Sequence, residues 1–391
     1  MQSSMRMNSV PDPLPAIPND AARPMFQRAL LRWYDKNRRD LPWRKTRDPY
    51  RIWLSEIMLQ QTRVAAVLEH YRLFLDTFPN VRKLAAASES AVLAAWSGLG
   101  YYRRARLMRQ CAQKIIADYC GQFPQTSQAL QTLPGIGRYT AAAVASIAFS
   151  EPIAVVDGNV ERVLQRLAGG SLTPKEMWQR AQSTLSKSRP ADFNQAMMEL
   201  GAMICTPRQP KCGTCPIRKW CATKGEASRP APPQRQFRKE IWCMLDQRNG
   251  QVRLVQRPKT SSLMASMWEL PQTSAPTSDS KQLSAAAQRR KIFVNPALGE
   301  QQAAAKRRKI TAHGASRGFP SKNKEAPKGR KIRRDASWRT FRHSITVADY
   351  TVHVTRADTS STKGKWIAMN EIPALPITGL TRKILKAAGI I

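Results

Sequence analysis

Two acidic residues of the sequence lie in settings that suit acid–base chemistry. Glu56 stands in the stretch W-L-S-E-I-M-L-Q-Q-T, where a helix would surround its carboxyl with apolar neighbours. Burial raises the pKa of a carboxyl and keeps a proton available near neutral pH, as a general acid requires. Asp157 follows an apolar run in the stretch V-D-G-N-V. The structural alternatives are a paired acid for Glu56 and, for Asp157, an N-cap of the helix expected at 159–167.

Four of the seven cysteines crowd into the spacing C-x6-C-x2-C-x5-C. Four thiolates on one short loop can hold a cubane iron–sulfur cluster or a tetrahedral zinc ion, and the spacing alone leaves both open. An odd total and this crowding argue against a disulfide framework. The expected ligands are Cys205, Cys212, Cys215 and Cys221, and the expected packing thiols are Cys111, Cys120 and Cys243.

The stretch L-P-G-I-G-R-Y-T-A predicts a tight turn that opens directly into a helix of small residues. Gly135 and Gly137 would let backbone N–H groups face outward at the helix N-terminus, which is a ready site for a DNA phosphate. A plain turn between two helices would use the same glycines. The basic surroundings and the cysteine group that follows favour the phosphate site.

The charge of the chain indicates the class of its partner. Its 391 residues contain 64 Lys and Arg against 27 Asp and Glu, which gives a formal net charge of +37. So large an excess favours a polyanion, and nucleic acid first of all. No apolar run approaches the length of a membrane span, and the N-terminal stretch does not resemble a secretory signal. The sequence therefore predicts an intracellular protein with no membrane partner.

Helical periodicity repeats between residues 21 and 225 and predicts an all-α domain. The expected helices are 51–77, 88–96, 105–119, 140–148, 159–167, 175–186 and 193–204. After a Pro-rich connector, β-branched and aromatic residues predict a smaller α/β or β-rich domain, with strands at 239–245, 252–256 and 345–355.

Three segments are expected to lack a fold of their own. Residues 1–20 form a Pro-rich leader, 226–235 a linker and 276–337 a basic insert. The folded domains are then 21–225, with its cysteine loop at 205–221, and a second domain made of 236–275 joined to 338–391.

These features together resemble one family. The glycine hairpin, the V-D-G-N aspartate and the cysteine spacing are shared by the helix–hairpin–helix DNA glycosylases, and L-S-E-I-M-L-Q-Q-T and G-L-G-Y-Y are similar to the A/G-specific adenine glycosylases of the MutY type. The resemblance covers about residues 26–223. It continues more thinly through R-P-K-T and L-M-A-S-M-W-E-L-P, which are similar to the Nudix-like C-terminal domain of that family. It implies a multidomain protein: an all-α helix–hairpin–helix domain with a [4Fe–4S] cluster loop, then a smaller α+β Nudix-like domain.

The resemblance implies a monomer that acts on double-stranded DNA and hydrolyses the N-glycosidic bond of adenine mispaired with 8-oxoguanine or guanine. Glu56 would protonate N7 of the adenine, and Asp157 would stabilise the oxocarbenium-like sugar through a transient covalent adduct. Tyr139 stands where bifunctional relatives carry a Schiff-base lysine, so lyase activity is expected to be absent or feeble. Asn159 and Tyr139 would position the sugar and its water. The expected location is with DNA in a bacterial cytoplasm or nucleoid rather than a nucleus.

An adenine stacked in a duplex must be extruded before it can react, and the gap must be filled. By the resemblance, Tyr101 would stack beside the opposite guanine lesion and Gln61 would occupy the vacated space. Trp43 and Arg44 would line the base pocket, with Arg44 offering hydrogen bonds to the adenine.

The second domain departs from the family. The Phe-Ser-His triplet that reads 8-oxoguanine in many relatives is not intact in the segment F-R-H-S-I-T. Either His343 and Ser344 do the reading, or Ile345 and Thr346 take the places of Phe and Ser with Val347 for His. No Nudix run of glutamates surrounds 268–270, so this domain is expected to recognise rather than hydrolyse.

Two rival functions remain open at this point. A bifunctional endonuclease III-like glycosylase and AP lyase shares the first domain, but Tyr139 and the additional domain argue against it. A non-catalytic basic DNA-binding module explains the charge, the hairpin and the cysteines, but it gives no reason for an acid at position 56 in an apolar setting.

Overall fold

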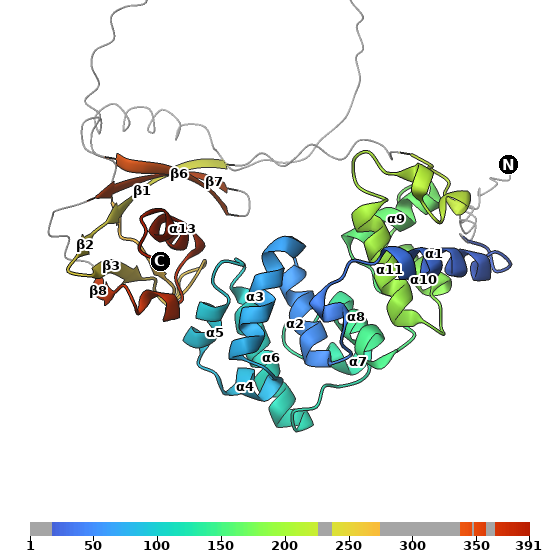
Figure 1. Ribbon diagram of the computed structural model, residues 1–391. Coiled ribbons are helices and arrows are strands. Elements are labelled where there is room, and N and C mark those ends of the chain that lie inside the picture. The colour runs from blue at the N-terminus through green and yellow to red at the C-terminus, as the bar shows by residue number, and fades with distance from the viewer. Residues whose placement is uncertain (1–17, 226–236, 274–336, 346–347, 357–363) are drawn as a thin grey trace, which may run out of the picture. The chain divides into compact units, whose positions relative to one another are not determined.

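The computed structural model describes residues 18–225, 237–273, 337–345, 348–356 and 364–391 (Figure 1). The linker expected at 226–235, almost all of the leader and almost all of the basic insert lie outside the described residues. The chain divides into two compact units, and each is described by itself. The first contains residues up to Arg235 together with Arg248–Glu269 and Gly364–Ile391, and the second contains Gln236–Gln247 and Leu270–Lys363.

Between residues 18 and 225 the described chain contains helices and no strands, as the periodicity predicts. Short polar side chains cap several of them: Ser88 and Thr126, for example, each accept a hydrogen bond from a backbone N–H of the first turn. The helices are α1 (Arg23–Asn37), α2 (Pro49–Leu59), α3 (Val64–Thr77), α4 (Val81–Ala86), α5 (Glu89–Ala95), α6 (Arg103–Tyr119), α7 (Ser127–Leu130), α8 (Arg138–Phe149), α9 (Gly158–Ala168), α10 (Pro174–Thr184) and α11 (Pro190–Met203), with short 3-10 turns η1 (Pro42–Arg44), η2 (Cys212–Thr214) and η3 (Arg218–Trp220).

The prediction of one helix over 51–77 is wrong, because the chain breaks there into α2 and α3. Gln61 has a φ of +56°, which no continuing right-handed helix permits. Neither Gly nor Pro marks the break, and apolar residues continue on both sides of it, so the periodicity hides it. Helices α1, α4 and α7 were not predicted. In the chain they lie before or between the helices that were predicted.

The helices bury two apolar clusters. The larger lies among α2, α3, α5, α6 and α8 around Trp53, Phe74 and Trp96, and the smaller lies among α1, α9, α10 and α11 around Phe26 and Phe193. In Figure 1 these helices form two corresponding groups, coloured from blue to green. Helix α8 packs against α2 of the first group and α11 of the second. Residues at its start therefore face the junction of the two groups.

The first unit also contains a small sheet and a helix from the end of the chain. Strand β3 (Gln251–Gln256) pairs antiparallel with β4 (Trp268–Glu269) and with β8 (Lys365–Ala368), and β2 (Gln247–Arg248) precedes it. Helix α13 (Gly379–Ala387) follows a 3-10 turn, η4 (Ile372–Ala374). None of the helices that the structure describes has the length and apolar character needed to cross a membrane.

This C-terminal segment completes the helical part of the first unit. Met267 is fully buried within the larger apolar cluster. The hydroxyls of Ser97 and Tyr102 both donate to the carbonyl of Ile377, at 3.0 and 3.3 Å, and Arg382 Nε donates to Ser97 Oγ. The compact unit thus takes in chain far beyond residue 225.

The second unit is a four-stranded sheet in the order β5-β1-β7-β6. Strand β1 (Phe237–Leu245) pairs parallel with β7 (Ala348–Arg356) and antiparallel with β5 (Gln272–Thr273), and β6 (Ser337–Ile345) pairs antiparallel with β7. The single strand expected at 345–355 is therefore wrong: Ile345 ends β6, and the next strand begins at Ala348. The apolar face of this sheet carries Cys243, Leu245, Val352 and Val354.

Candidate active site

A cavity of about 790 Å³ opens among α2, α8, α9, α11 and η1. It brings together residues that are far apart in the sequence, from Trp43 on η1 to Glu199 on α11. Glu56 and Gln61 reach it from α2 and the turn that follows, and Tyr139 reaches it from the first turn of α8. The predicted site residues that line it are Trp43, Arg44, Glu56, Gln61, Tyr139, Asp157 and Asn159.

Glu56 is a buried acid. Glu56 is 7% exposed, and the hydroxyl of Tyr139 donates a hydrogen bond to Glu56 Oε2 at 2.5 Å. Burial raises the pKa of Glu56 to about 7; the hydrogen bond from Tyr139 opposes this rise and the charge of Asp157 adds to it. Burial and the two nearby carboxyls raise the pKa of Tyr139 well above its usual value, so its phenol keeps its proton and donates. The pair can therefore present a protonated carboxyl at neutral pH.

Asp157 is the N-cap of α9, so its structural interpretation is correct. Its Oδ1 accepts from the backbone N–H groups of Asn159 and Val160 at 3.0 and 2.8 Å, and its Oδ2 accepts from Asn159 Nδ2 at 2.9 Å. These bonds satisfy two backbone N–H groups of the first turn of α9 and one side-chain amide. The same bonds fix its direction at the cavity wall. Capping and a role for its charge in the cavity are compatible.

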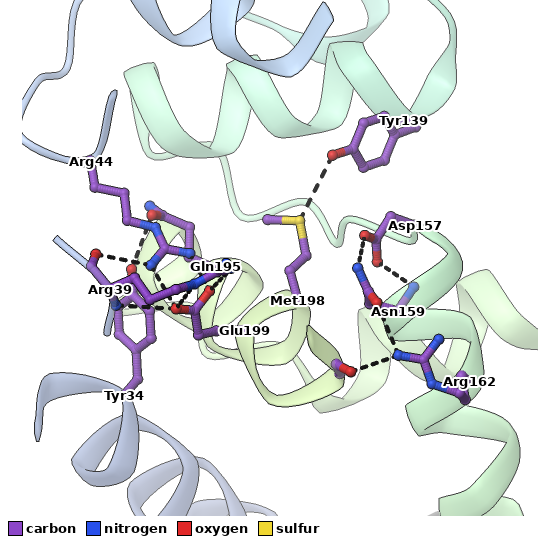
Figure 2. A network of polar contacts seen from close by, with 11 residues as sticks. Tyr34, Arg39, Arg44, Tyr139, Asp157, Asn159, Arg162, Gln195, Met198 and Glu199 are labelled. Carbon is purple, nitrogen blue, oxygen red and sulfur yellow. Dashed lines mark hydrogen bonds and ion pairs between the residues drawn. The ribbon is translucent and has the colours of Figure 1, made fainter. Parts of the chain in front are cut away.

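Asn159 is itself anchored, as Figure 2 shows. Its Oδ1 accepts from Arg162 Nη2 at 2.9 Å, and the same guanidinium donates to the carbonyls of Gly201 and Cys205. A Cβ at Gly201 would lie 2.6 Å from Asn159 Cβ, so only glycine lets α11 approach α9 this closely. The side chain beside Asp157 is therefore held from both sides.

Glu199 is a site residue that the sequence analysis missed. It is fully buried on α11 and accepts hydrogen bonds from Arg39 and Arg44, the shortest at 2.6 Å from Arg44 Nη2 (Figure 2). Burial alone would raise the pKa of Glu199, but these bonds lower it to about 2. Its only signal in the sequence is an acid within the apolar stretch M-M-E-L. Arg44 lines the cavity as predicted, with its guanidinium engaged by Glu199.

The two residues predicted to enter the DNA lie on separate turns. Gln61 follows α2, and Tyr101 precedes α6 with 46% of its surface exposed. Both have left-handed backbones, with φ of +56° and +47°. A non-glycine residue holds this conformation only where its surroundings impose it.

The glycine turn joins α7 to α8. Gly135 has a φ of +76°, and a Cβ there would lie 2.8 Å from Leu107 Cβ, so glycine is required. Gly137 is the N-cap of α8 with an ordinary φ of −86°, and a Cβ there would meet no atom within 4 Å. The space beside Gly137 at the N-terminus of α8 is therefore open, which is compatible with phosphate binding there.

The four clustered cysteines surround a small hollow after α11. All are free thiols, and Arg166 Nη1 donates to Cys205 Sγ at 3.3 Å. Within the described part of the chain, no three Cys, His, Asp or Glu side chains converge closely enough to hold a single metal ion. Four thiols that line one hollow are a suitable ligand set for an iron–sulfur cluster.

Of the remaining cysteines, Cys111 and Cys243 are buried as predicted, whereas the prediction for Cys120 is wrong because its side chain is exposed. The candidate lesion readers belong to the second unit. His343 lies on β6 opposite Tyr350, and Ser344 lies opposite Asp349. Thr346 falls outside the described residues.

Comparisons with known proteins give matches to the helical region and to the cysteine loop. Residues 54–187 match the HhH-GPD superfamily of base excision DNA repair proteins, and residues 205–221 match the iron–sulfur binding domain of endonuclease III. An adenine DNA glycosylase of Rattus norvegicus is 46% identical over 50% of this chain and 41% of its own, and one of Homo sapiens is 35% identical over 69% and 61%. The chain thus spans less than two thirds of the length of these curated relatives.

Among solved structures, a thermostable thymine-DNA glycosylase is similar over 52% of this chain and 97% of its own, with 34% identity and a TM-score of 0.50. The superfamily match covers the helices that carry Glu56, Tyr139 and Asp157, and the second match covers the cysteine loop, so the class is that of the iron–sulfur helix–hairpin–helix DNA repair proteins. The chain belongs to this HhH-GPD superfamily of DNA glycosylases, and the adenine DNA glycosylases are among the proteins it is similar to. Its cofactor is a [4Fe–4S] cluster, which Cys205, Cys212, Cys215 and Cys221 would hold, since all four lie in the matched segment and line one hollow.

Proposed function

We propose that the protein is a monofunctional DNA glycosylase that removes adenine mispaired with 8-oxoguanine or guanine. The observation that carries the proposal is the buried Glu56 carboxyl, with a pKa of about 7, which shares one cavity with the capped carboxylate of Asp157. The rat and human relatives are named adenine DNA glycosylases, and we therefore take adenine as the base that is removed. The protein would act as a monomer on DNA, in a bacterial nucleoid.

Cleavage of an N-glycosidic bond needs a proton on the leaving base and negative charge near the sugar. Glu56 would give its proton to N7 of adenine, so that the protonated base accepts the electron pair of the breaking bond and leaves as neutral adenine. Asp157 would stabilise the positive charge that develops on the sugar, and water then completes the hydrolysis. Tyr139, by its bond to Glu56, would hold the acid in place.

The cavity lining supports the proposal that the enzyme is monofunctional. A lyase needs an amine that forms an imine with the sugar. Tyr139 has none, and among the described residues no lysine lines the cavity. The cysteine loop would hold its cluster as a structural element beside α9, because Arg162 and Arg166 connect that loop to the helix that Asp157 caps.

One assay separates this proposal from its rivals. Duplexes with adenine opposite 8-oxoguanine are incubated with the protein and analysed with and without alkali. We expect strand breaks that depend on alkali and no product trapped by borohydride. Breaks without alkali would favour the endonuclease III-like lyase, and no base release would favour the DNA-binding module.

The cluster gives a second prediction. The purified protein should be brown, with broad absorbance near the violet edge of the visible range, and should contain iron and sulfide in equal amounts. Metal analysis of the full-length protein is the measurement. A colourless protein with stoichiometric zinc would contradict the assignment.

We further propose that residues 236–275 and 338–391 form the Nudix-like domain that reads the opposite base, with His343, Ser344 and Thr346 as candidate readers. A good base-edge hydrogen bond contributes about 1–3 kcal/mol of discrimination. His343→Ala is therefore expected to lower the ratio of excision from A:8-oxoG over A:G by about tenfold. The control is Thr340→Ala, on the same strand. An unchanged ratio would leave lesion reading to Tyr101 and the helical unit.

A further inference from the structure

One partly buried cation contacts both turns that carry the residues predicted to enter DNA. Arg104 lies in the first turn of α6, and its guanidinium is directed at the turn after α2 and at the turn before α6. These turns contain Gln61 and Tyr101, each with a left-handed backbone. Such a backbone is strained for a residue other than glycine and persists only where neighbouring groups hold it.

On the Gln61 side, Arg104 closes the end of a helix. Its Nη1 donates to the carbonyls of Ile57, Met58 and Gln60 at 2.6, 3.1 and 2.7 Å. The last carbonyls of a helix have no partner within it, and a cation there also suits the helix dipole. The carbonyl of Gln60 belongs to the peptide whose orientation sets φ of Gln61. Arg104 therefore holds the conformation that directs Gln61.

On the Tyr101 side, the contacts are both polar and aromatic. Arg104 Nη2 donates to the carbonyls of Leu99 and Gly100 at 3.3 and 3.4 Å. The guanidinium carbon lies 5.3 Å from the centroid of the Tyr101 ring and 5.4 Å from that of Trp96. Trp96 Nε1 in turn donates to the carbonyl of Gly100 at 3.0 Å. One side chain thus holds both turns.

The charge of this side chain is kept. Burial lowers the pKa of Arg104 to about 10, which leaves it protonated at neutral pH. Its partners in the described part of the chain are carbonyls, a hydroxyl and ring faces rather than a carboxylate. Within the described residues, no ion pair of Arg104 therefore offsets this charge at the two turns, and the cation can attract DNA phosphates.

We propose that Arg104 is a positioning residue that joins the Gln61 and Tyr101 turns into one wedge, so that both side chains enter the duplex together as the base leaves it. The inference rests on the proposed function. A planar fork with donors on two nitrogens reaches both sets of carbonyls, whereas a lysine ammonium occupies one point and reaches one set. Arg104→Lys keeps the charge and breaks the connection.

The test compares Arg104→Lys with Arg103→Lys, an exposed arginine one position earlier on the same helix. Duplexes carry 2-aminopurine, whose fluorescence rises on unstacking, in place of the target adenine opposite 8-oxoguanine. Extrusion by Arg104→Lys is expected to fall about tenfold while duplex affinity stays within about twofold, and Arg103→Lys is expected to match the wild-type protein. Normal extrusion by Arg104→Lys would overturn the proposal.

Single-turnover base release is then measured on an ordinary mispair and on a duplex with an abasic site opposite the adenine, where unpairing costs less. Arg104→Lys should lose rate on the first substrate and recover most of it on the second, with an unchanged pH profile. Equal losses on both would place the effect at the acid on α2 and overturn the wedge. Extrusion is read without base release, so a wild-type protein that extrudes but releases no adenine would contradict the proposed function alone.

A double-mutant cycle covers the case in which Arg104→Lys does not fold. Extrusion is measured in the protein that keeps Arg104, for Gln61→Ala, for Tyr101→Ala and for the double variant. If the two side chains act as one wedge, the extrusion lost by the double variant should be smaller than the product of the two single losses, by about threefold or more. Independent losses would overturn the proposal.

Discussion

Glu56→Gln is expected to lose base release by two to four orders of magnitude, about the contribution of a general acid. The amide fills the same space and still accepts from Tyr139, and no positive charge is lost, so affinity for the mispaired duplex should be unchanged. Single-turnover excision and duplex binding are measured side by side. Glu69→Gln, at an exposed acid on α3, is the matched control. A near-normal rate in Glu56→Gln would remove this residue from the mechanism.

The raised pKa of Glu56 also predicts how the rate and the free energy of unfolding depend on pH. Because Glu56 is proposed to act in its protonated form, the wild-type rate is expected to be level below pH 7 and to fall above it. The folded-state pKa of about 7 exceeds the ordinary value of 4.5, so stability is present at low pH and lost as pH rises through 7. Glu56→Gln should therefore gain unfolding free energy relative to wild type between pH 5 and 8, by up to about 3 kcal/mol. Urea unfolding at the two pH values measures it.

Asp157→Asn is expected to lose at least two orders of magnitude in base release while staying folded. Asparagine caps helices as well as aspartate does, so the free energy of unfolding should change by less than about 1 kcal/mol. What the variant lacks is the negative charge near the sugar. Single-turnover excision and thermal unfolding separate the two roles.

Asp157→Ala provides the comparison, because it removes the cap as well and should cost about 1 kcal/mol more in unfolding free energy. If Asp157→Asn released adenine at nearly the wild-type rate, the aspartate would be a cap and nothing else.

Local signals in the sequence predicted much of the helical unit. The spacing of the four cysteines, the glycine turn before α8 and the polar cap before α9 are determined within a few residues, and each has the local form that its pattern predicts. The burial of Glu56 follows from its apolar neighbours on α2. The catalytic roles assigned to Glu56 and Asp157 stay predictions.

Features that depend on distant partners could not be predicted in this way. Glu199 is buried because Arg39 and Arg44 neutralise it from more than 150 residues away. Strand β1 finds its parallel partner β7 on the far side of the basic insert, and no local pattern specifies that pairing. No local pattern distinguishes Arg104 from the other basic residues, because its role depends on carbonyl partners at the end of another helix.

The late segment that packs into the helical unit has a consequence for how the protein is made. Ile377 and Met267 leave the ribosome well after residue 225, later by on the order of ten seconds for Ile377 at usual rates of synthesis. Until then Ser97 and Tyr102 lack their partner, and the apolar cluster has a gap where Met267 belongs. The nascent helical unit is therefore incomplete on both sides of the turn that carries Tyr101, at Ser97 and at Tyr102. A fragment that stops at residue 225 would keep this unfinished state permanently, so its altered behaviour on DNA would report a folding defect along with any loss of base recognition.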